Sequence, residues 1–167
     1  MSYLVRRISR AKWDNDEYDY VNDDNSPADA ITSCLKTFNN ELSTWLIDDI
    51  DQLDNALLCL ITGSKQESLN TIQIIYFQID EIINRGLILE KTPGDTVISQ
   101  YRDMHFDIKC LTYETLGNIK EIVLDCLRND RCRVITKSEL KKKLKKAIEE
   151  DELFEKSLLN EKLQNII

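Results

Sequence analysis

The stretch ITSCLKTFNNELSTWLIDDIDQLDNALLCLITGS, residues 31–64, changes its hydrophobic period partway along. Its first half is rich in β-branched and aromatic residues and alternates between two faces, a pattern that favours strands. Residues 39–41, Asn-Asn-Glu, tolerate the left-handed backbone of a tight connection, so we predict a β-hairpin over 31–48. Apolar residues then recur at helical spacing, which predicts a helix over 50–62.

Strand patterns also dominate the sequence on either side of this stretch. Residues 3–8 and 87–92 favour strands, and residues 105–110 alternate between apolar and polar. Residues 71–78 fit a strand or a helix, because isoleucines recur at helical spacing within a strongly β-branched run. We choose a strand to Phe77, followed by a short helix over 79–85.

The last third of the chain, 113–167, reads as helical. An apolar stripe covers 113–129, Thr136 and Glu139 form a capping box before a second periodic run, and a last helix covers 155–165. Strands come first and helices gather at the end. The sequence therefore predicts a single α+β domain over 1–167, with a mainly antiparallel or mixed sheet, helices packed on one face and a helical C-terminal third.

Composition limits the function classes. The 167 residues are 42% hydrophobic and 31% charged, which is ordinary for one globular domain. The net charge of −8 argues against nucleic acid as the default partner and suits a basic one. The N-terminus begins apolar and then turns basic, the reverse of a secretory signal, and no apolar run approaches the length of a membrane span. We expect a cytoplasmic protein without a membrane anchor.

Cysteines and glycines give no cofactor signal. The five cysteines are odd in number and none forms a C-x-x-C pair, so we expect reduced, mostly buried thiols. With four glycines there is no glycine-rich phosphate-binding motif. Grouped aspartates at 48–54 are better explained as helix capping than as a metal site. We therefore predict no metal and no cofactor.

The only histidine, His105, offers one catalytic hypothesis. His105 and Asp107 fall on the same face of the strand predicted over 105–110, and an aspartate can orient a histidine and favour its charged form. A cysteine near this pair would allow nucleophilic chemistry. A lone histidine at a strand start is more often structural, so we predict no catalytic residues, and an enzyme built on His105 and Asp107 is our third hypothesis.

Residues 128–146 hold nine basic side chains and two acidic ones. Within them, Leu140 and Leu144 begin an apolar stripe that continues at Ala147 and Ile148, which indicates a helix packed on one side with its lysines in water. No aromatic residue interleaves the basic ones, so base stacking is not offered. A nucleic-acid-associated regulator that uses residues 128–146 is our second hypothesis.

Residues 14–29 hold seven acidic side chains and no basic one, and we predict that they form a loop. Self-repulsion of this kind is relieved when a basic partner arrives, and tyrosines supply contact area. Our first hypothesis is an acidic cytoplasmic protein that binds and neutralises a basic protein partner, as an immunity protein, antitoxin or adaptor does. The predicted partner-binding residues are Asp16, Glu17, Tyr18, Asp19, Tyr20, Asp23 and Asp24.

Overall fold

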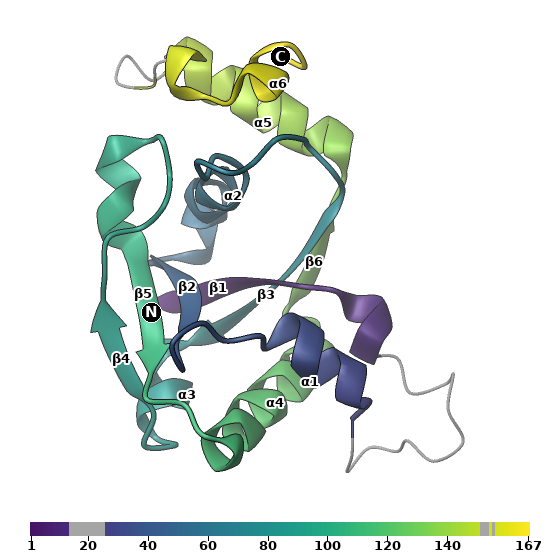
Figure 1. Ribbon diagram of the computed structural model, residues 1–167, viewed down its shortest axis with the longest axis vertical. Helices are drawn as coiled ribbons and strands as arrows, with labels where there is room; N and C mark the ends of the chain where they lie inside the picture. The colour runs from purple at the N-terminus through teal and green to yellow at the C-terminus, as the bar shows by residue number, and fades with distance from the viewer. Residues whose placement is uncertain (14–25, 151–153, 155) are drawn as a thin grey trace.

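The computed structural model describes residues 1–13, 26–150, 154 and 156–167, and its described part is built on a six-stranded sheet (Figure 1). Every pairing between neighbouring strands is antiparallel. The α+β prediction with a mainly antiparallel sheet is therefore confirmed. The spatial order of the strands is β4 (Ile88–Lys91), β5 (His105–Lys109), β2 (Leu42–Ile47), β1 (Tyr3–Ile8), β3 (Ile72–Gln78) and β6 (Cys132–Ile135).

The central strand β1 is paired unequally on its two sides. It pairs with β3 over six residues, from Tyr3 opposite Gln78 to Ile8 opposite Gln73. It pairs with β2 over only three, and the last pair is Val5 with Trp45. Strand β2 meanwhile continues alongside β5. Beyond Val5, β1 and β2 therefore separate, and the sheet has a gap between them.

The sheet is covered on both faces, which corrects the prediction that helices lie on one face only. Helices α1 (Ala28–Cys34) and α4 (Tyr113–Arg128) close one core. Helices α2 (Leu53–Ile61), α5 (Lys137–Glu150) and α6 (Glu161–Gln164) close the other. Figure 1 shows the two groups on opposite sides of the sheet.

The reason for two layers of helices is the apolar character of the inner strands. Successive residues of β1 point to opposite faces, and Leu4 joins one core while Val5 joins the other. In β3, Ile75 and Ile74 divide in the same way. A strand that is apolar on both faces must be buried on both faces, so helices are needed above and below.

The predicted hairpin over 31–48 is wrong in its first arm. Residues Ala28–Cys34 form the helix α1, which begins after Pro27 and buries Ala30 and Cys34 on one side. Because these two residues are four apart, they share a helical face, and their burial outweighs the β-propensity of the segment. The Asn39–Asn40 connection does adopt positive φ angles of 53° and 60°, but it closes only a single bridge between Phe38 and Glu41.

The helical C-terminal third contains a strand that the sequence analysis missed. Strand β6 pairs with β3 at one edge of the sheet, between α4 and α5. Its β-branched residues Val134 and Ile135 carried a strand signal, which was passed over because they lie inside the basic stretch. The last predicted helix, over 155–165, is reduced to a 3-10 turn, Lys156–Leu158, and α6.

The other predicted elements are confirmed. The ambiguous run is strand β3 followed by the short helix α3 (Ile79–Ile83), and Gly86 beyond it has a φ of 68°. Asp49 caps a 3-10 turn, Ile50–Gln52, that leads into α2. Thr136 and Glu139 form the expected capping box before α5. Two further 3-10 helices cover Arg10–Trp13 and Ser99–Met104.

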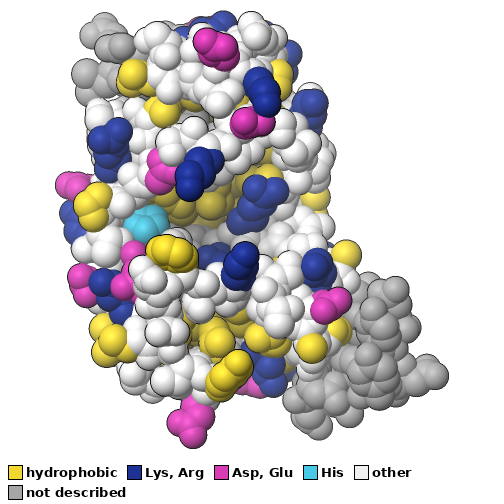
Figure 2. Space-filling model, in the orientation of Figure 1, with side chains coloured by type: hydrophobic (Ala, Val, Ile, Leu, Met, Phe, Trp, Pro, Cys, Tyr) yellow, Lys and Arg dark blue, Asp and Glu magenta, His cyan; other side chains and the backbone are white. Residues whose placement is uncertain are grey.

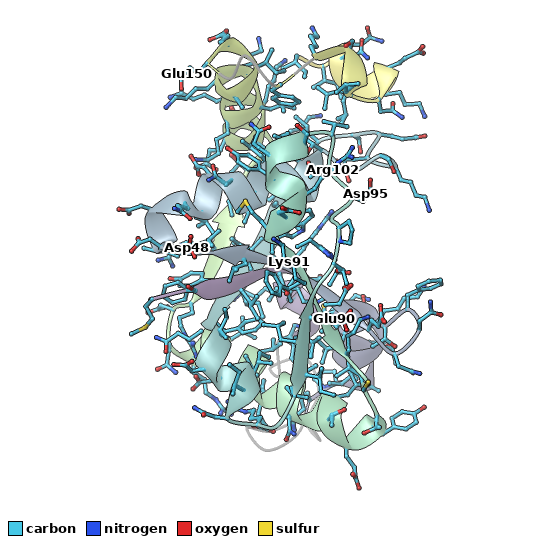
Figure 3. The ribbon with its side chains drawn as sticks, turned by 90° about the vertical axis from the view of Figure 1, so that its left-hand side faces the viewer. Asp48, Glu90, Lys91, Asp95, Arg102 and Glu150 are labelled. Carbon is cyan, nitrogen blue, oxygen red and sulfur yellow. The ribbon has the colours of Figure 1, made fainter. Side chains whose placement is uncertain are left out.

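The β4 edge of the sheet, opposite the β6 edge, carries charged side chains. Figure 3 looks onto this side, where Glu90 and Lys91 lie on β4, and Asp95 and Arg102 lie between β4 and β5. Lys109 on β5 bridges Glu41 and Glu90, with Nζ 3.2 and 3.3 Å from their carboxylates. Charges on an edge strand discourage pairing with another chain. No helix in the described ranges is long and apolar enough to cross a membrane.

A glycine allows close packing between the β4–β5 connection and the second core. A Cβ atom added to Gly94 would lie 2.6 Å from Cζ3 of Trp45 and 2.8 Å from Cβ of His105. Real Cβ atoms essentially never approach neighbours so closely. The bare backbone at Gly94 is therefore what lets the Trp45 ring pack under this connection.

We expect Gly94→Ala to lower the free energy of unfolding by about 1–3 kcal/mol, because the added methyl group must displace the Trp45 ring. Gly117→Ala is the matched control: nothing lies within 4 Å of its added Cβ in α4, so a gain of up to about 1 kcal/mol is expected. Urea unfolding of both variants measures the difference. Equal stability of Gly94→Ala and the wild type would show that Trp45 is not packed against this glycine.

Candidate functional site

A cavity of about 510 Å³ lies where β1 and β2 separate. Figure 2 shows the molecule hollowed between the upper and lower helical layers, with Lys and Arg side chains around the hollow and hydrophobic side chains within it. This volume is within the range of small-molecule binding sites in proteins. The gap in the sheet is therefore also the main candidate for a functional site.

The cavity wall is basic and polar with an apolar part, and none of the described residues that line it is acidic. It is formed by the end of β1, the end of α1, the start of β2, one residue of α2 and the start of β3. The lining residues are Arg6, Arg7, Ile8, Ser9, Ser33, Cys34, Ser43, Trp45, Leu60, Thr71, Ile72 and Gln73.

Arg6 fills part of the gap with its guanidinium group. Its Nη1 donates to the carbonyl oxygen of Ser43 at 2.6 Å, and its Nε and Nη2 donate to the carbonyl oxygen of Cys34 at 3.3 and 2.8 Å. Ser43 lies on β2 and Cys34 ends α1, so a side chain ties together three elements where the backbone ladder has stopped. The guanidinium thus satisfies a carbonyl group of β2 beside the gap and one at the C-terminal end of α1.

The positive charge of Arg6 has no counterion among the described residues. Its hydrogen-bond acceptors are neutral carbonyl groups, and no carboxylate forms an ion pair with it. Burial lowers the pKa of Arg6 to about 10, so the group is still charged at neutral pH. Arg6 is half-buried, and a partly desolvated charge without an opposite charge is unfavourable. The cavity is therefore a place where an anion would be stabilised.

Arg7 lies next along β1 and starts on the opposite face of the sheet, because neighbouring strand residues alternate. Both arginines line the cavity, since it lies in the gap that opens beside β1 after Val5. The side chain of Arg7 is exposed, lines the same cavity, and makes no hydrogen bond or ion pair with the residues that the structure describes. All five N–H groups of this guanidinium are therefore available to a ligand.

A hydrogen-bond network of buried polar side chains supports the cavity wall at Ser43. The hydroxyl of Ser43 donates to Oδ1 of Asp107 at 3.1 Å, and the hydroxyl of Thr92 donates to Oδ2 at 2.7 Å. Oγ1 of Thr92 also lies 2.8 Å from Nδ1 of His105. Because a hydroxyl has one proton, Nδ1 of His105 must carry the proton in this contact. The network joins β4, β5 and β2 and fixes the position of Ser43.

The predicted placement of His105 and Asp107 on one face of β5 is confirmed, with Nε2 of the histidine 3.9 Å from Oδ1 of the aspartate. Their exposed fractions are only 8% and 7%, and the ring of Trp45 packs edge-on against His105 with centroids 4.9 Å apart. Among the described residues, no cysteine thiol is hydrogen-bonded to His105. Burial lowers the pKa of His105, although Asp107 and Thr92 act in the opposite direction.

The structure does not place the predicted partner-binding residues. Asp16, Glu17, Tyr18, Asp19, Tyr20, Asp23 and Asp24 all lie in 14–25, outside the described residues. Asp29, at the end of the acidic segment, belongs to α1 rather than to a loop. The binding role of residues 14–25 stays a prediction.

Several basic side chains of the stretch 128–146 make contacts within the protein. Arg131 is held by Glu81 and Asp125, and Arg133 lies over the ring of Tyr76 with Cζ 5.6 Å from its centroid. Lys143 pairs with Asp54 on α2 at 2.5 Å. Strand β6 and helix α5 also divide the stretch between two elements. Several of its charged side chains are thus paired with other residues of the protein.

Metal ligands are not grouped in the described part of the chain. Within those residues, no three His, Cys, Asp or Glu side chains are placed to hold a metal ion. In the aspartate group at 48–54, Asp49 accepts from the backbone of Asp51, and Asp54 pairs with Lys143. All five cysteines are free thiols, and Cys34, Cys59 and Cys126 are buried.

The cavity residues were missed at the level of sequence, although β1 held a signal. Leu4, Arg6 and Ile8 are spaced by two, so a strand places an arginine in a row whose neighbours are buried. A charged residue in an apolar row is rarely fully buried without a partner or a function. Ser43 and Gln73 carried no comparable signal, because their place depends on where β1 and β2 separate.

Comparisons with models of protein families, with curated proteins and with solved structures find no match for this chain.

We expect the stability of the protein to fall as the pH drops from 7 through 6.5, the ordinary pKa of histidine. Because the folded pKa of His105 is the lower one, the unfolded chain binds a proton at a pH where the folded protein does not. The stability that comes from a neutral His105 is fully present above pH 6.5. It is lost as the pH falls towards and below the lowered pKa. Urea unfolding at several pH values measures it.

His105→Asn is the control for this pH dependence, since its amide can still donate to Thr92 but does not titrate. As His105 is the only histidine, the variant should lack the part of the profile near pH 6. Profiles of the same shape for the wild type and His105→Asn would contradict the assignment.

Proposed function

We propose that this protein acts by binding, and that the cavity between β1 and β2 holds an anionic group of its ligand. The observation that carries this proposal is a pair of guanidinium groups, Arg6 and Arg7, lining a cavity to which no described residue contributes a carboxylate. The cavity is thus opposite in sign to the whole chain, whose net charge is −8. A local positive site in an acidic protein indicates recognition of an anion rather than a general basic surface.

Arg6 makes anion binding energetically favourable. Its side chain is half-buried and its hydrogen-bond acceptors are neutral carbonyl groups, so part of its solvation is lost without an opposite charge among the described residues. An anion placed between Arg6 and Arg7 would supply the missing opposite charge. Hydrogen bonds between ionised groups are roughly twice as strong as neutral ones, and the planar guanidinium suits oxyanions with two or more oxygens.

Sulfate is a simple probe for this proposal. We expect sulfate, added at constant ionic strength, to raise the melting temperature of the wild type along a saturable curve, because it binds the folded state only. Arg6→Gln and Arg7→Gln should weaken this binding by about tenfold or more, the loss expected for a charged hydrogen bond. Differential scanning fluorimetry measures the curves.

Arg10→Gln is the matched control, since Arg10 is exposed, close in sequence and outside the cavity lining. It removes the same charge and should leave the sulfate curve unchanged. Sulfate also stabilises proteins non-specifically by exclusion from their surface. An identical, non-saturating rise in the wild type and all three variants would therefore contradict the proposal. Arg7→Gln keeps the test valid if Arg6→Gln does not fold, because Arg7 holds no described residue in place.

A second proposal rests on the sequence alone: residues 14–29 bind a basic protein partner, as in an immunity protein, antitoxin or adaptor. Seven carboxylates without a basic residue, with Tyr18 and Tyr20 between them, favour it. Charge would increase the rate of association, and the tyrosine rings would slow dissociation. This surface and the cavity attract opposite charges, so the two proposals can be tested separately.

For the acidic segment, Asp16→Asn, Glu17→Gln and Asp19→Asn together should slow association with a partner isolated from the native host and reduce its salt dependence. Tyr18→Ala with Tyr20→Ala should instead speed dissociation. Exposed charges contribute little to stability, so folding should change little. Surface plasmon resonance gives both rates. Unchanged rates in both variants would exclude residues 14–29 as the binding element.

A further inference from the structure

The charges that line the cavity select among anions. Arg6 and Arg7 bring two positive charges, and no acidic side chain among the described lining residues offsets either. A single carboxylate would balance one of them and leave the other without a counterion. A phosphomonoester carries about −1.5 to −2 charges at pH 7, which balances the pair.

The hydrogen-bond donors of the cavity also favour a phosphoryl group. A guanidinium has five N–H groups, and Arg6 uses one each on Nε, Nη1 and Nη2, so one remains on each of Nη1 and Nη2. Arg7 has all five, and Ser9, Ser33 and Thr71 add hydroxyl groups to the lining. Three terminal oxygens of a phosphoryl group can use this set more fully than the two oxygens of a carboxylate.

The size of the cavity requires more than a phosphoryl group. At about 510 Å³ it is in the range of sites for whole small molecules, and a bare phosphate would leave most of it filled with water. Trp45, Leu60 and Ile72 give part of the wall an apolar surface. A ligand that matches both parts has a doubly charged end and an organic body.

We propose that the ligand is a small organic phosphomonoester, of the size of a mononucleotide or a sugar phosphate. Its phosphoryl group lies between Arg6 and Arg7, and its body lies against Leu60 and Ile72. This inference rests on the proposed function, because it names the class of anion that the cavity binds.

Matched probes test the charge of the ligand by isothermal titration calorimetry on the full-length protein. Phenyl phosphate and benzoate share an aromatic ring and differ in the anionic group. We expect phenyl phosphate to bind at least tenfold more tightly than benzoate at pH 7.5, and more tightly than inorganic phosphate. Adenosine monophosphate and ribose 5-phosphate, run alongside, tell whether a base or a sugar is the preferred body.

The second proton of phosphate gives an independent readout. In a phosphomonoester such as phenyl phosphate the pKa of this proton is near 6, so binding of the dianion should weaken by about tenfold between pH 7.5 and pH 5, whereas sulfate stays a dianion throughout. The titratable groups around the two arginines are Cys34 on α1, and His105 and Asp107 on β5 behind Ser43 and Trp45. Their titration affects both probes equally, so the ratio of phosphate to sulfate binding isolates the proton of the ligand.

Arg7→Gln should remove most of the preference for phenyl phosphate over benzoate, because one positive charge then remains, and Arg10→Gln should keep it. Three results would overturn the inference while leaving anion binding intact: benzoate binding as tightly as phenyl phosphate, a phosphate-to-sulfate ratio that does not change with pH, or inorganic phosphate binding as tightly as its organic esters. Absence of binding by every anion, sulfate included, would instead overturn the proposed function itself.

Discussion

The guanidinium of Arg6, placed where β1 and β2 separate, is the interaction on which the site depends. Strand β1 leaves β2 after Val5, yet stays paired with β3 to its end. Backbone carbonyl groups along such a gap need donors, and Arg6 supplies them to Ser43 and Cys34. One side chain thus closes the gap structurally and leaves a positive charge at the bottom of the resulting cavity.

The rest of the molecule holds this gap open in a fixed shape. Cores on both faces bury β1 and β3, so the central strand cannot shift towards β2 without disturbing two layers of helices. On the far side, β2 is fixed to β5 by its ladder and by the network of Ser43, Asp107 and Thr92. The packing of Trp45 against Gly94 and His105 supports the same wall. His105 is therefore held in a packed and hydrogen-bonded position.

The strands and long helices could be predicted because their hydrophobic periods are clear and their caps are local. The capping box of Thr136 and Glu139 was predicted for this reason, and so was a capping role for the aspartates at 48–54, which Asp49 performs. The hairpin failed because the β-branched residues of 31–37 favoured a strand, whereas the buried side at Ala30 and Cys34 follows a helix. Covering helices on both faces could have been expected from the apolar pairs Leu4–Val5 and Ile74–Ile75.

The candidate site was less predictable, since it depends on strand separation. Arg6 interrupts a buried row and could have been singled out from the spacing of Leu4 and Ile8. The other wall residues come from segments far apart in the chain, and sequence gives no sign that β1 and β2 pair over only three residues. The local hydrophobic pattern thus predicts the helices and strands, whereas the cavity depends on how β1 and β2 pair in the folded protein.

The most direct measurement is the NMR response of the arginine side chains, observed as Nε–Hε signals during titration with phosphate. The account predicts large, saturable shifts for Arg6 and Arg7 with one common dissociation constant, and little change for Arg10, which lies outside the cavity lining. Small shifts that grow linearly and are shared by all the arginines would contradict it, because they would show that phosphate finds no defined site between β1 and β2.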